Sequence, residues 1–215
     1  MLVEAAMVEG AMVEGTMTDT KGGLPILAFP AQAAWEEWLA AQPPTARGLW
    51  LKLAKKDTGI ATVSQPEAIE SALCHGWIDG QLGKFDDTYW LIRFTPRGPQ
   101  SKWSAINRDR ATKLIAGGRM LPTGLREVER AQADGRWEVA YAPQSTATAP
   151  DDLAAALAAH PAAQQLFDTL DSANRYAIIY RVGDAKKPET RARRIEQYVA
   201  MLLRGETIHP RKGKS

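Results

Sequence analysis

Apolar residues in the first part of the chain follow two periods, which predict helices and strands in turn. Three residues fall on one stripe of a predicted helix over residues 31–41: Trp35, Trp38 and Leu39. A second helix opens at Ser64-Gln65-Pro66-Glu67, which is a capping box with proline in the first turn. Gly76 is the predicted end of that helix, because glycine is common just past a helix C-terminus.

Patterns typical of strands occur before, between and after these helices in the sequence. Leu49, Leu51 and Leu53 alternate with Trp50 and Lys52, as in a half-buried strand. Leu24–Phe29 predicts a short edge strand, since proline is tolerated at an edge. Two further strands are predicted over 77–82 and 88–95, joined by a hairpin loop at 83–87. On the last strand, alternation separates two faces: Trp90, Ile92 and Phe94 on one, and Tyr89, Leu91, Arg93 and Thr95 on the other.

Helical patterns dominate after this hairpin. A loop at 96–99 leads into a helix that begins at Ser101 or Ser104. One stripe of that helix is predicted to hold Trp103, Asn107, Ala111, Leu114 and Ile115. Another helix follows over 124–134. Beyond a linker, a cap at 148–151 and a cap at Ser172 introduce further helices, and the last helix starts at Pro188 and ends at Gly205. The pattern predicts an α+β fold: a small antiparallel or mixed sheet packed with helices, followed by an all-helical C-terminal unit.

Domain boundaries follow from composition. Residues 1–23 contain Met-Val-Glu-Gly twice and are interpreted as a disordered extension, with Met17 as the natural start. Residues 24–142 are predicted to form the α+β domain and 143–150 a linker. Residues 151–210 then form the helical unit, and 211–215 a basic tail.

The composition is typical of a water-soluble globular protein, with 45% hydrophobic and 24% charged residues. The net charge is only +2, yet the segment from Asp184 onward has nine Lys/Arg against four Asp/Glu, a balance of +5. The single cysteine excludes an internal disulfide, and scattered histidines argue against a structural zinc site. No run of apolar residues predicts a membrane helix, and no secretory signal is recognised, so we expect a cytoplasmic protein.

Cys74 and His75 are the first candidates for catalysis. Adjacent residues on a helix point about 100° apart, so the two side chains are not predicted to meet. Cys74 also lies near a helix C-terminus, where the dipole disfavours a thiolate. A buried packing role is therefore favoured over a nucleophile.

Asp79 leaves three readings open. It can accept hydrogen bonds in a turn, pair with Arg93 or Arg97, or act as a general acid or base. Aspartate is a poor strand former, so a local partner is expected in each case.

A second candidate is an anion site where the hairpin meets the next helix. Arg97, Ser101, Lys102 and Ser104 surround a Gly/Pro turn before a helix N-terminus, where N–H groups and hydroxyls favour anions. The alternative is that the arginine bonds loop carbonyls and a serine only caps the helix. Asn107 is predicted either to tie the helix to the hairpin loop or to contact a ligand.

The basic C-terminus is a third candidate. Its cations include Lys186, Lys187, Arg191, Arg193 and Arg194, with little aromatic interleaving. A solvated helix face is therefore favoured over weak contact with nucleic acid or an acidic protein.

Four motifs resemble the bacterial YdeI/OmpD-associated, or bacteriocin-protection, family: CHGWIDG, RFTPRGPQSKWSAIN, GRWEVAY and KKPETRARRIEQYVAMLLRGE. The resemblance extends over residues 24–210. It implies a role in resistance to bacteriocins or envelope stress, and it implies no enzymatic reaction and no cofactor. It also implies that the motif positions form one site: Trp77, Asp79, Gly80, Arg97, Trp103, Asn107, Arg136, Trp137 and Tyr141.

Together these observations predict a stress-associated module that binds a small anionic or polar ligand. The predicted ligand-binding residues are Trp77, Asp79, Arg93, Arg97, Ser101, Trp103, Ser104, Asn107, Arg136, Trp137 and Tyr141. No metal site is expected. An enzyme using Asp79 or Cys74 and an interaction module using the basic C-terminus remain the alternatives.

Overall fold

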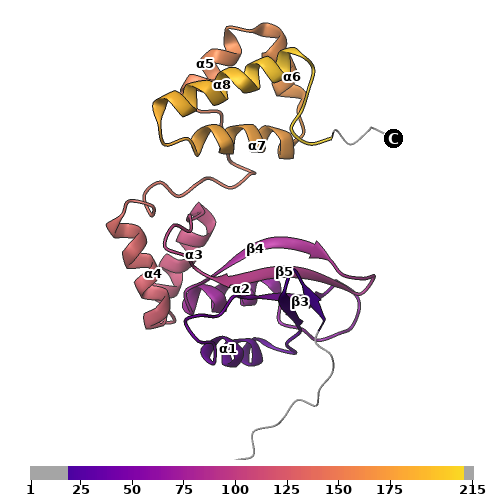
Figure 1. Ribbon diagram of the computed structural model, residues 1–215. Helices are drawn as coiled ribbons and strands as arrows, with labels where there is room; N and C mark the ends of the chain where they lie inside the picture. Colours follow the sequence, from indigo (N-terminus) through magenta and orange to yellow (C-terminus); the bar gives the residue numbers. More distant parts are fainter. Residues whose placement is uncertain (1–18, 211–215) are drawn as a thin grey trace, which may run out of the picture. The chain divides into compact units, whose positions relative to one another are not determined.

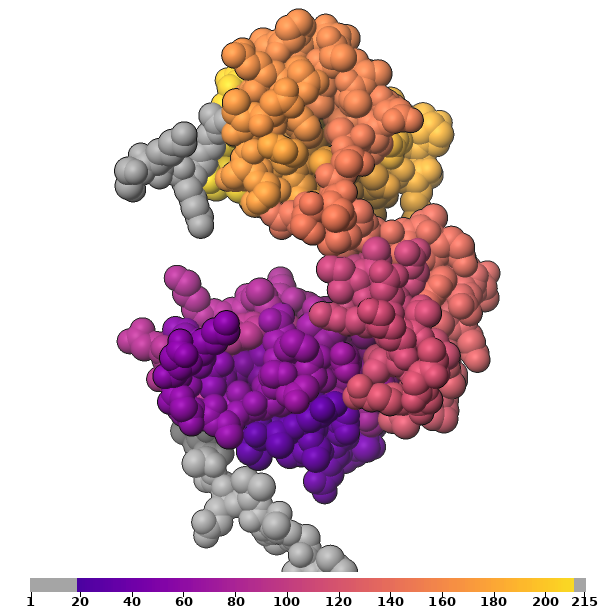
Figure 2. All heavy atoms as spheres, turned by 180° about the vertical axis from the view of Figure 1, so that it is seen from behind, coloured from indigo at the N-terminus to yellow at the C-terminus, as the bar shows by residue number. Residues whose placement is uncertain are grey.

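The computed structural model describes residues 19–210, which form two compact units (Figures 1 and 2). Unit 1 comprises the described residues up to Ser101, together with Arg110–Ala131. Unit 2 comprises Lys102–Asp109 and the described residues from Gln132 onward. Of the predicted disordered extension 1–23, residues 1–18 lie outside the described residues, as does the predicted basic tail, whereas Thr20–Lys21 form a strand instead.

Unit 1 contains the sheet, the helices that cover it and a helical segment further along the chain. Its elements in chain order are β1 (Thr20–Lys21), β2 (Leu24–Leu27), α1 (Gln32–Ala40), β3 (Leu49–Ala54), α2 (Gln65–Cys74), β4 (Trp77–Lys84), β5 (Tyr89–Pro96) and α4 (Pro122–Ala133). Helix α3 (Ala105–Ala116) begins in unit 2 and ends in unit 1.

The strands of the described chain form a mixed sheet in the order β1-β2-β3-β5-β4, which confirms the predicted fold class. Strands β2 and β3 are parallel, and the other neighbouring pairs are antiparallel. The predicted edge position of residues 24–29 is wrong, because Thr20 and Lys21 pair outside β2. This two-residue strand carries no apolar alternation, so the sequence pattern did not reveal it.

One face of the sheet carries the main core of unit 1, as the alternation predicted. Leu49 and Leu51 are opposite Phe94 and Ile92, and all four are fully buried. Trp35 of α1 packs on Phe94, with ring centroids 5.3 Å apart. Figure 1 shows α1 and α2 on the same side of the sheet. The predicted stripe of α1 therefore covers this face.

Helix α2 begins and ends where the sequence predicted. The Ser64 hydroxyl accepts a hydrogen bond from the Glu67 N–H, and the Glu67 carboxylate accepts one from the Ser64 N–H. Gly76 follows the helix with φ = 77°, a conformation that glycine adopts without strain. A methyl group at Gly124 of α4 would lie 2.5 Å from the Cys74 carbonyl oxygen, so α4 approaches the end of α2 closely.

Unit 2 is a helical bundle made of α5 (Asp151–Ala158), α6 (Pro161–Thr169), α7 (Ser172–Gly183) and α8 (Pro188–Leu203). Its core is built from apolar residues of all four helices, including Leu153, Phe167, Ile178 and Val199. Two predicted caps are wrong. Pro150 stands at the N-cap of α5 without a side-chain bond, and Asp171 rather than Ser172 caps α7 by accepting the Asn174 N–H at 2.8 Å.

Candidate functional site

The predicted ligand-binding residues are distributed over both units. Unit 1 holds Trp77, Asp79, Arg93, Arg97 and Ser101, and unit 2 holds Trp103, Ser104, Asn107, Arg136, Trp137 and Tyr141.

In unit 1, strand register separates the predicted residues. Trp77 is buried and packs edge-on against Trp38, on the face that the helices cover. Asp79 is opposite Phe94 and so shares that face. Arg93 is opposite Trp50 and projects from the other face of the sheet. Register thus places Asp79 and Arg93 on opposite faces of the sheet.

Arg97 and Ser101 flank the turn that follows β5. Arg97 is 6% exposed, and its N–H donates to the Gly76 carbonyl at 3.0 Å. The Ser101 hydroxyl accepts the Gly98 N–H at 3.0 Å, and the Ser101 N–H donates back to the Gly98 carbonyl. Ser101 therefore closes the turn, and its hydroxyl is hydrogen-bonded to the backbone of the turn.

In unit 2, the predicted residues pack around the start of α3. The sequence allowed the helix to begin at either Ser101 or Ser104. Ser104 is the cap, since its hydroxyl accepts the Asn107 N–H at 3.1 Å. Trp103 is buried before the helix and packs edge-on against Trp137 at 4.8 Å between centroids. The prediction had placed Trp103 on the helix itself. Tyr141 joins this group by two backbone hydrogen bonds, one to the Trp103 carbonyl and one from the Ala105 N–H.

Two other details of this region differ from the prediction. Ile115 was predicted to line the buried stripe of α3, but it is 39% exposed, since α3 buries only its Ala111 and Leu114 positions there. Arg136 forms a local ion pair with Asp134, two residues away, at 2.8 Å. This pair lowers the pKa of Asp134 through the hydrogen bond from Arg136, although partial burial of the carboxylate acts against it.

The second face of the sheet carries a small core of its own. Trp50, Leu91 and Leu24 are buried there, with Ile26 and Phe85 packed against them. The prediction treated this face of β5 as wet, but Leu91 is only 1% exposed. The indole N–H of Trp50 donates to the Lys21 carbonyl at 3.0 Å.

The sheet curls around this second face. A methyl group at Gly83 of β4 would lie only 2.5 Å from the Lys21 ammonium of β1. In a flat sheet, β1 and β4 would be about 19 Å apart, beyond the reach of a lysine side chain. A register shift in β4 between Asp79 and Leu82 indicates a bulge, a feature that bends strands. The face with Trp50 is therefore the concave one.

Three cations occupy this concave face, and we call them the concave-face cations: Lys21, Lys52 and Arg93. The Lys21 ammonium lies 4.4 Å from the centroid of the Trp50 ring. The Lys52 ammonium lies between Phe85 and Tyr89, at 5.0 and 4.8 Å from their centroids. Contact with a ring stabilises a cation without neutralising it. All three side chains are partly buried.

Among the strands of the described chain, no residue on the concave face carries a carboxylate. Asp19 precedes β1 and Asp86 lies in the hairpin loop, where its carboxylate accepts the Thr88 and Tyr89 N–H groups at 2.7 Å. Arg93 adds a buried Nε with no hydrogen-bond partner in the described residues. Positive charge is thus concentrated where a concave surface focuses its field, which suits the binding of an anion.

Sequence reasoning found Arg93 and missed Lys21 and Lys52. Lys52 was visible in the alternation of β3, opposite to the leucines. Lys21 falls before the first predicted strand, so no pattern connected it to the sheet.

Cys74 and His75 lack the features of a catalytic pair. Cys74 is buried at the end of α2, and burial raises the pKa of its thiol, which Arg119 partly offsets. Burial lowers the pKa of His75, against the opposing influence of Glu36. Both shifts favour the neutral forms. This supports the packing role that the sequence favoured for Cys74.

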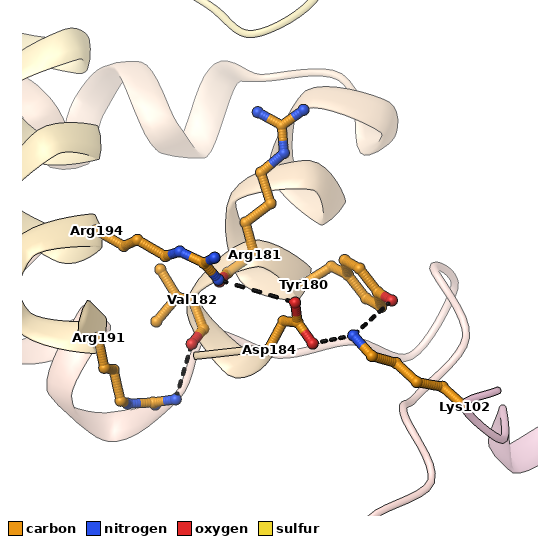
Figure 3. A network of polar contacts seen from close by, with 7 residues as sticks. All are labelled: Lys102, Tyr180, Arg181, Val182, Asp184, Arg191 and Arg194. Atoms are coloured by element: carbon orange, nitrogen blue, oxygen red, sulfur yellow. Dashed lines mark hydrogen bonds and ion pairs between the residues drawn. The ribbon is translucent and has the colours of Figure 1, made fainter. Parts of the chain in front are cut away.

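The basic residues of the last two helices are largely engaged within unit 2. Arg191 holds Asp152 through two hydrogen bonds of 2.5 and 2.8 Å and donates to the Val182 carbonyl. The hydrogen bond from Arg191 lowers the pKa of Asp152. Arg194 contacts the Arg181 carbonyl and lies 3.9 Å from Asp184 (Figure 3). Only the Arg181 guanidinium points away from this network in Figure 3.

Two searches of the described residues bear on the class of site. No group of three or more histidine, cysteine, aspartate or glutamate side chains within residues 19–210 could hold a metal ion. In the same part of the chain, no helix has the length and apolar character needed to span a membrane.

The fold and these surfaces define a two-unit α+β protein with a cationic concave sheet face and a helical C-terminal unit. Residues 146–205, in that helical unit, match the family described as bacteriocin-protection, YdeI or OmpD-associated. Residues 27–127 match a different family, described as a domain of unknown function (DUF8412). No curated protein and no solved structure matches the chain.

The family match confirms the predicted resemblance and corrects its extent. The motif KKPETRARRIEQYVAMLLRGE falls almost wholly within residues 146–205. CHGWIDG and RFTPRGPQSKWSAIN both fall instead within residues 27–127. The sequence motifs predicted a single family, whereas they fall within matches to two different family models.

Proposed function

We propose that the chain is an anion-binding protein of the bacteriocin-protection class, acting in the cytoplasm during a stress or resistance response. The ligand occupies the concave face of the sheet. The observation that carries this proposal is the presence of three cations on a face whose strands carry no carboxylate. Aromatic rings hold the two lysines in place.

The proposal keeps Arg93 from the predicted site and adds Lys21 and Lys52. Ser101 and Ser104 are left out because they lie in the turn after β5 and at the start of α3 rather than on the concave face. Recognition by base stacking is disfavoured as well. Trp50 is 6% exposed and lies beneath Lys21, and Lys52 lies over the Tyr89 ring, so a lysine already occupies one face of each ring.

Thermal denaturation tests this function. Sulfate, phosphate and citrate are compared with chloride at one ionic strength, so that general screening is constant. An anion present at ten times its dissociation constant adds about 1.4 kcal/mol to the free energy of unfolding. In a chain of this size that raises the Tm by about 3–6 °C.

Variants assign the effect to the concave face. Lys52→Gln and Arg93→Gln are expected to reduce the Tm increase by more than half. The matched control is Lys113→Gln on the exposed side of α3, which removes the same charge elsewhere. The proposal fails if none of the anions raises the Tm, or if the control loses as much of the increase as the two concave-face variants.

A further inference from the structure

The spacing of the concave-face cations restricts the class of ligand, if the proposed anion-binding function is correct. Arg93 is directly opposite Trp50 in the strand register, and Lys52 is two residues further along β3. Side chains at such diagonal positions are about 7–8 Å apart at their Cα atoms. The Lys21 ammonium lies above Trp50 and beside Gly83. The three charges therefore surround a single aromatic residue.

A monovalent anion can compensate only part of the charge of the three cations. Three cations held close together repel one another, and one small anion leaves at least one of them uncompensated. A ligand with three linked negative groups compensates all three, and the translational freedom of the ligand is lost only once.

We infer that the concave face binds a linear polyanion of the condensed-phosphate type, recognised through its charges alone. Tripolyphosphate is the smallest member with one phosphate group for each cation. A lysine lies over each of the Trp50 and Tyr89 rings, so a base attached to the phosphate chain is not expected to add to binding.

Gly83 is the specificity-determining position in this arrangement. Its missing side chain leaves room for the Lys21 ammonium, which would be 2.5 Å from a methyl group there. The same methyl group would be 3.5 Å from Trp50 and Leu91, which is ordinary contact. Gly83→Ala is thus expected to displace the flexible end of Lys21 and leave the core in place. The result is a face with two cations in position instead of three.

Isothermal titration calorimetry at constant ionic strength provides the test. The probes are phosphate, pyrophosphate, tripolyphosphate and ATP. Affinity is expected to rise about tenfold for each further cation that the ligand engages. ATP is expected to bind no more tightly than tripolyphosphate. Gly83→Ala should lower the affinity for tripolyphosphate to about that for pyrophosphate, without changing the affinity for phosphate.

The matched control is Gly80→Ala on the same strand, where a methyl group would meet only the Arg93 carbonyl oxygen at 3.7 Å. This variant should bind all four probes as the unmodified protein does. Equal affinity for phosphate and tripolyphosphate would overturn the inference and leave the anion-binding function standing. Tighter binding of ATP by tenfold or more would also overturn it, because the base would then be recognised. Absence of binding by all four probes would remove both proposals.

Discussion

The ammonium of Lys102 donates a hydrogen bond to the hydroxyl of Tyr180 over 3.3 Å, joining residues far apart in the sequence (Figure 3). The same ammonium pairs with the carboxylate of Asp184 and lies 5.1 Å from the centre of the Tyr180 ring. Lys102 precedes α3 along the chain, whereas Tyr180 and Asp184 belong to the end of α7. These contacts fasten the segment before α3 to the helical bundle of unit 2.

The Lys102–Asp184 pair is expected to contribute little by itself. Their side chains are 42% and 33% exposed, and exposed ion pairs contribute about 0.2–1 kcal/mol. A double-mutant cycle with Lys102→Met and Asp184→Asn should return a coupling energy in that range from urea denaturation. A coupling energy above about 2 kcal/mol would show that the pair is far better shielded from water than its exposure indicates.

Two glycine substitutions should shift stability in opposite directions. Gly124→Ala would place a methyl group 2.5 Å from the Cys74 carbonyl oxygen and 2.6 Å from that of Leu73. We expect a loss of about 1–3 kcal/mol, because backbone must move to relieve the contact. Gly183→Ala at the end of α7 meets no atom within 4 Å and should gain about 0.4–1 kcal/mol. Urea denaturation measures both, and equal effects would contradict the close approach of α4 to α2.

The thiol of Cys74 should react slowly. Burial raises its pKa, so the reactive thiolate is scarce at neutral pH, and the side chain is also inaccessible. Iodoacetamide at pH 7.5 is expected to label the unfolded chain at least tenfold faster than the native protein. Rapid labelling of the native protein would instead revive the nucleophile that the sequence left as an alternative.

His75 should make the protein sensitive to mild acid. Its folded pKa is lowered by burial, so the unfolded chain takes up a proton at a higher pH than the native state does. The stabilisation is present above the ordinary histidine pKa of about 6.5 and is lost as the pH falls below it. His75→Asn should therefore flatten the decline in the free energy of unfolding between pH 7 and pH 5.

Local patterns predicted much of the fold. The alternation in β3 and β5 assigned Leu51 and Ile92 to the buried face, and the register confirms that they are opposite each other. The capping box at Ser64 and the stop at Gly76 also proved correct, since both depend on residues within one turn of the helix end.

The site depended on contacts that local patterns do not contain. The curl of the sheet brings Lys21 next to Gly83, although no periodicity relates these two positions. Because β2 was predicted to be the edge strand, β1 was not predicted at all. The predicted cluster around Arg97 and Asn107 rests on closeness in sequence and stays a prediction.

The two units exchange segments of chain, and this limits how the protein can be divided. Lys102–Asp109 belongs to unit 2, yet Arg110–Ala131 returns to unit 1 before the chain reaches the C-terminal helices. A single cut at any peptide bond therefore leaves at least one unit missing a piece. A gene fragment encoding only the family-matched residues 146–205 would lack both Trp103 and Trp137, which pack together in unit 2. The boundary between the two units therefore does not fall at a single position in the sequence.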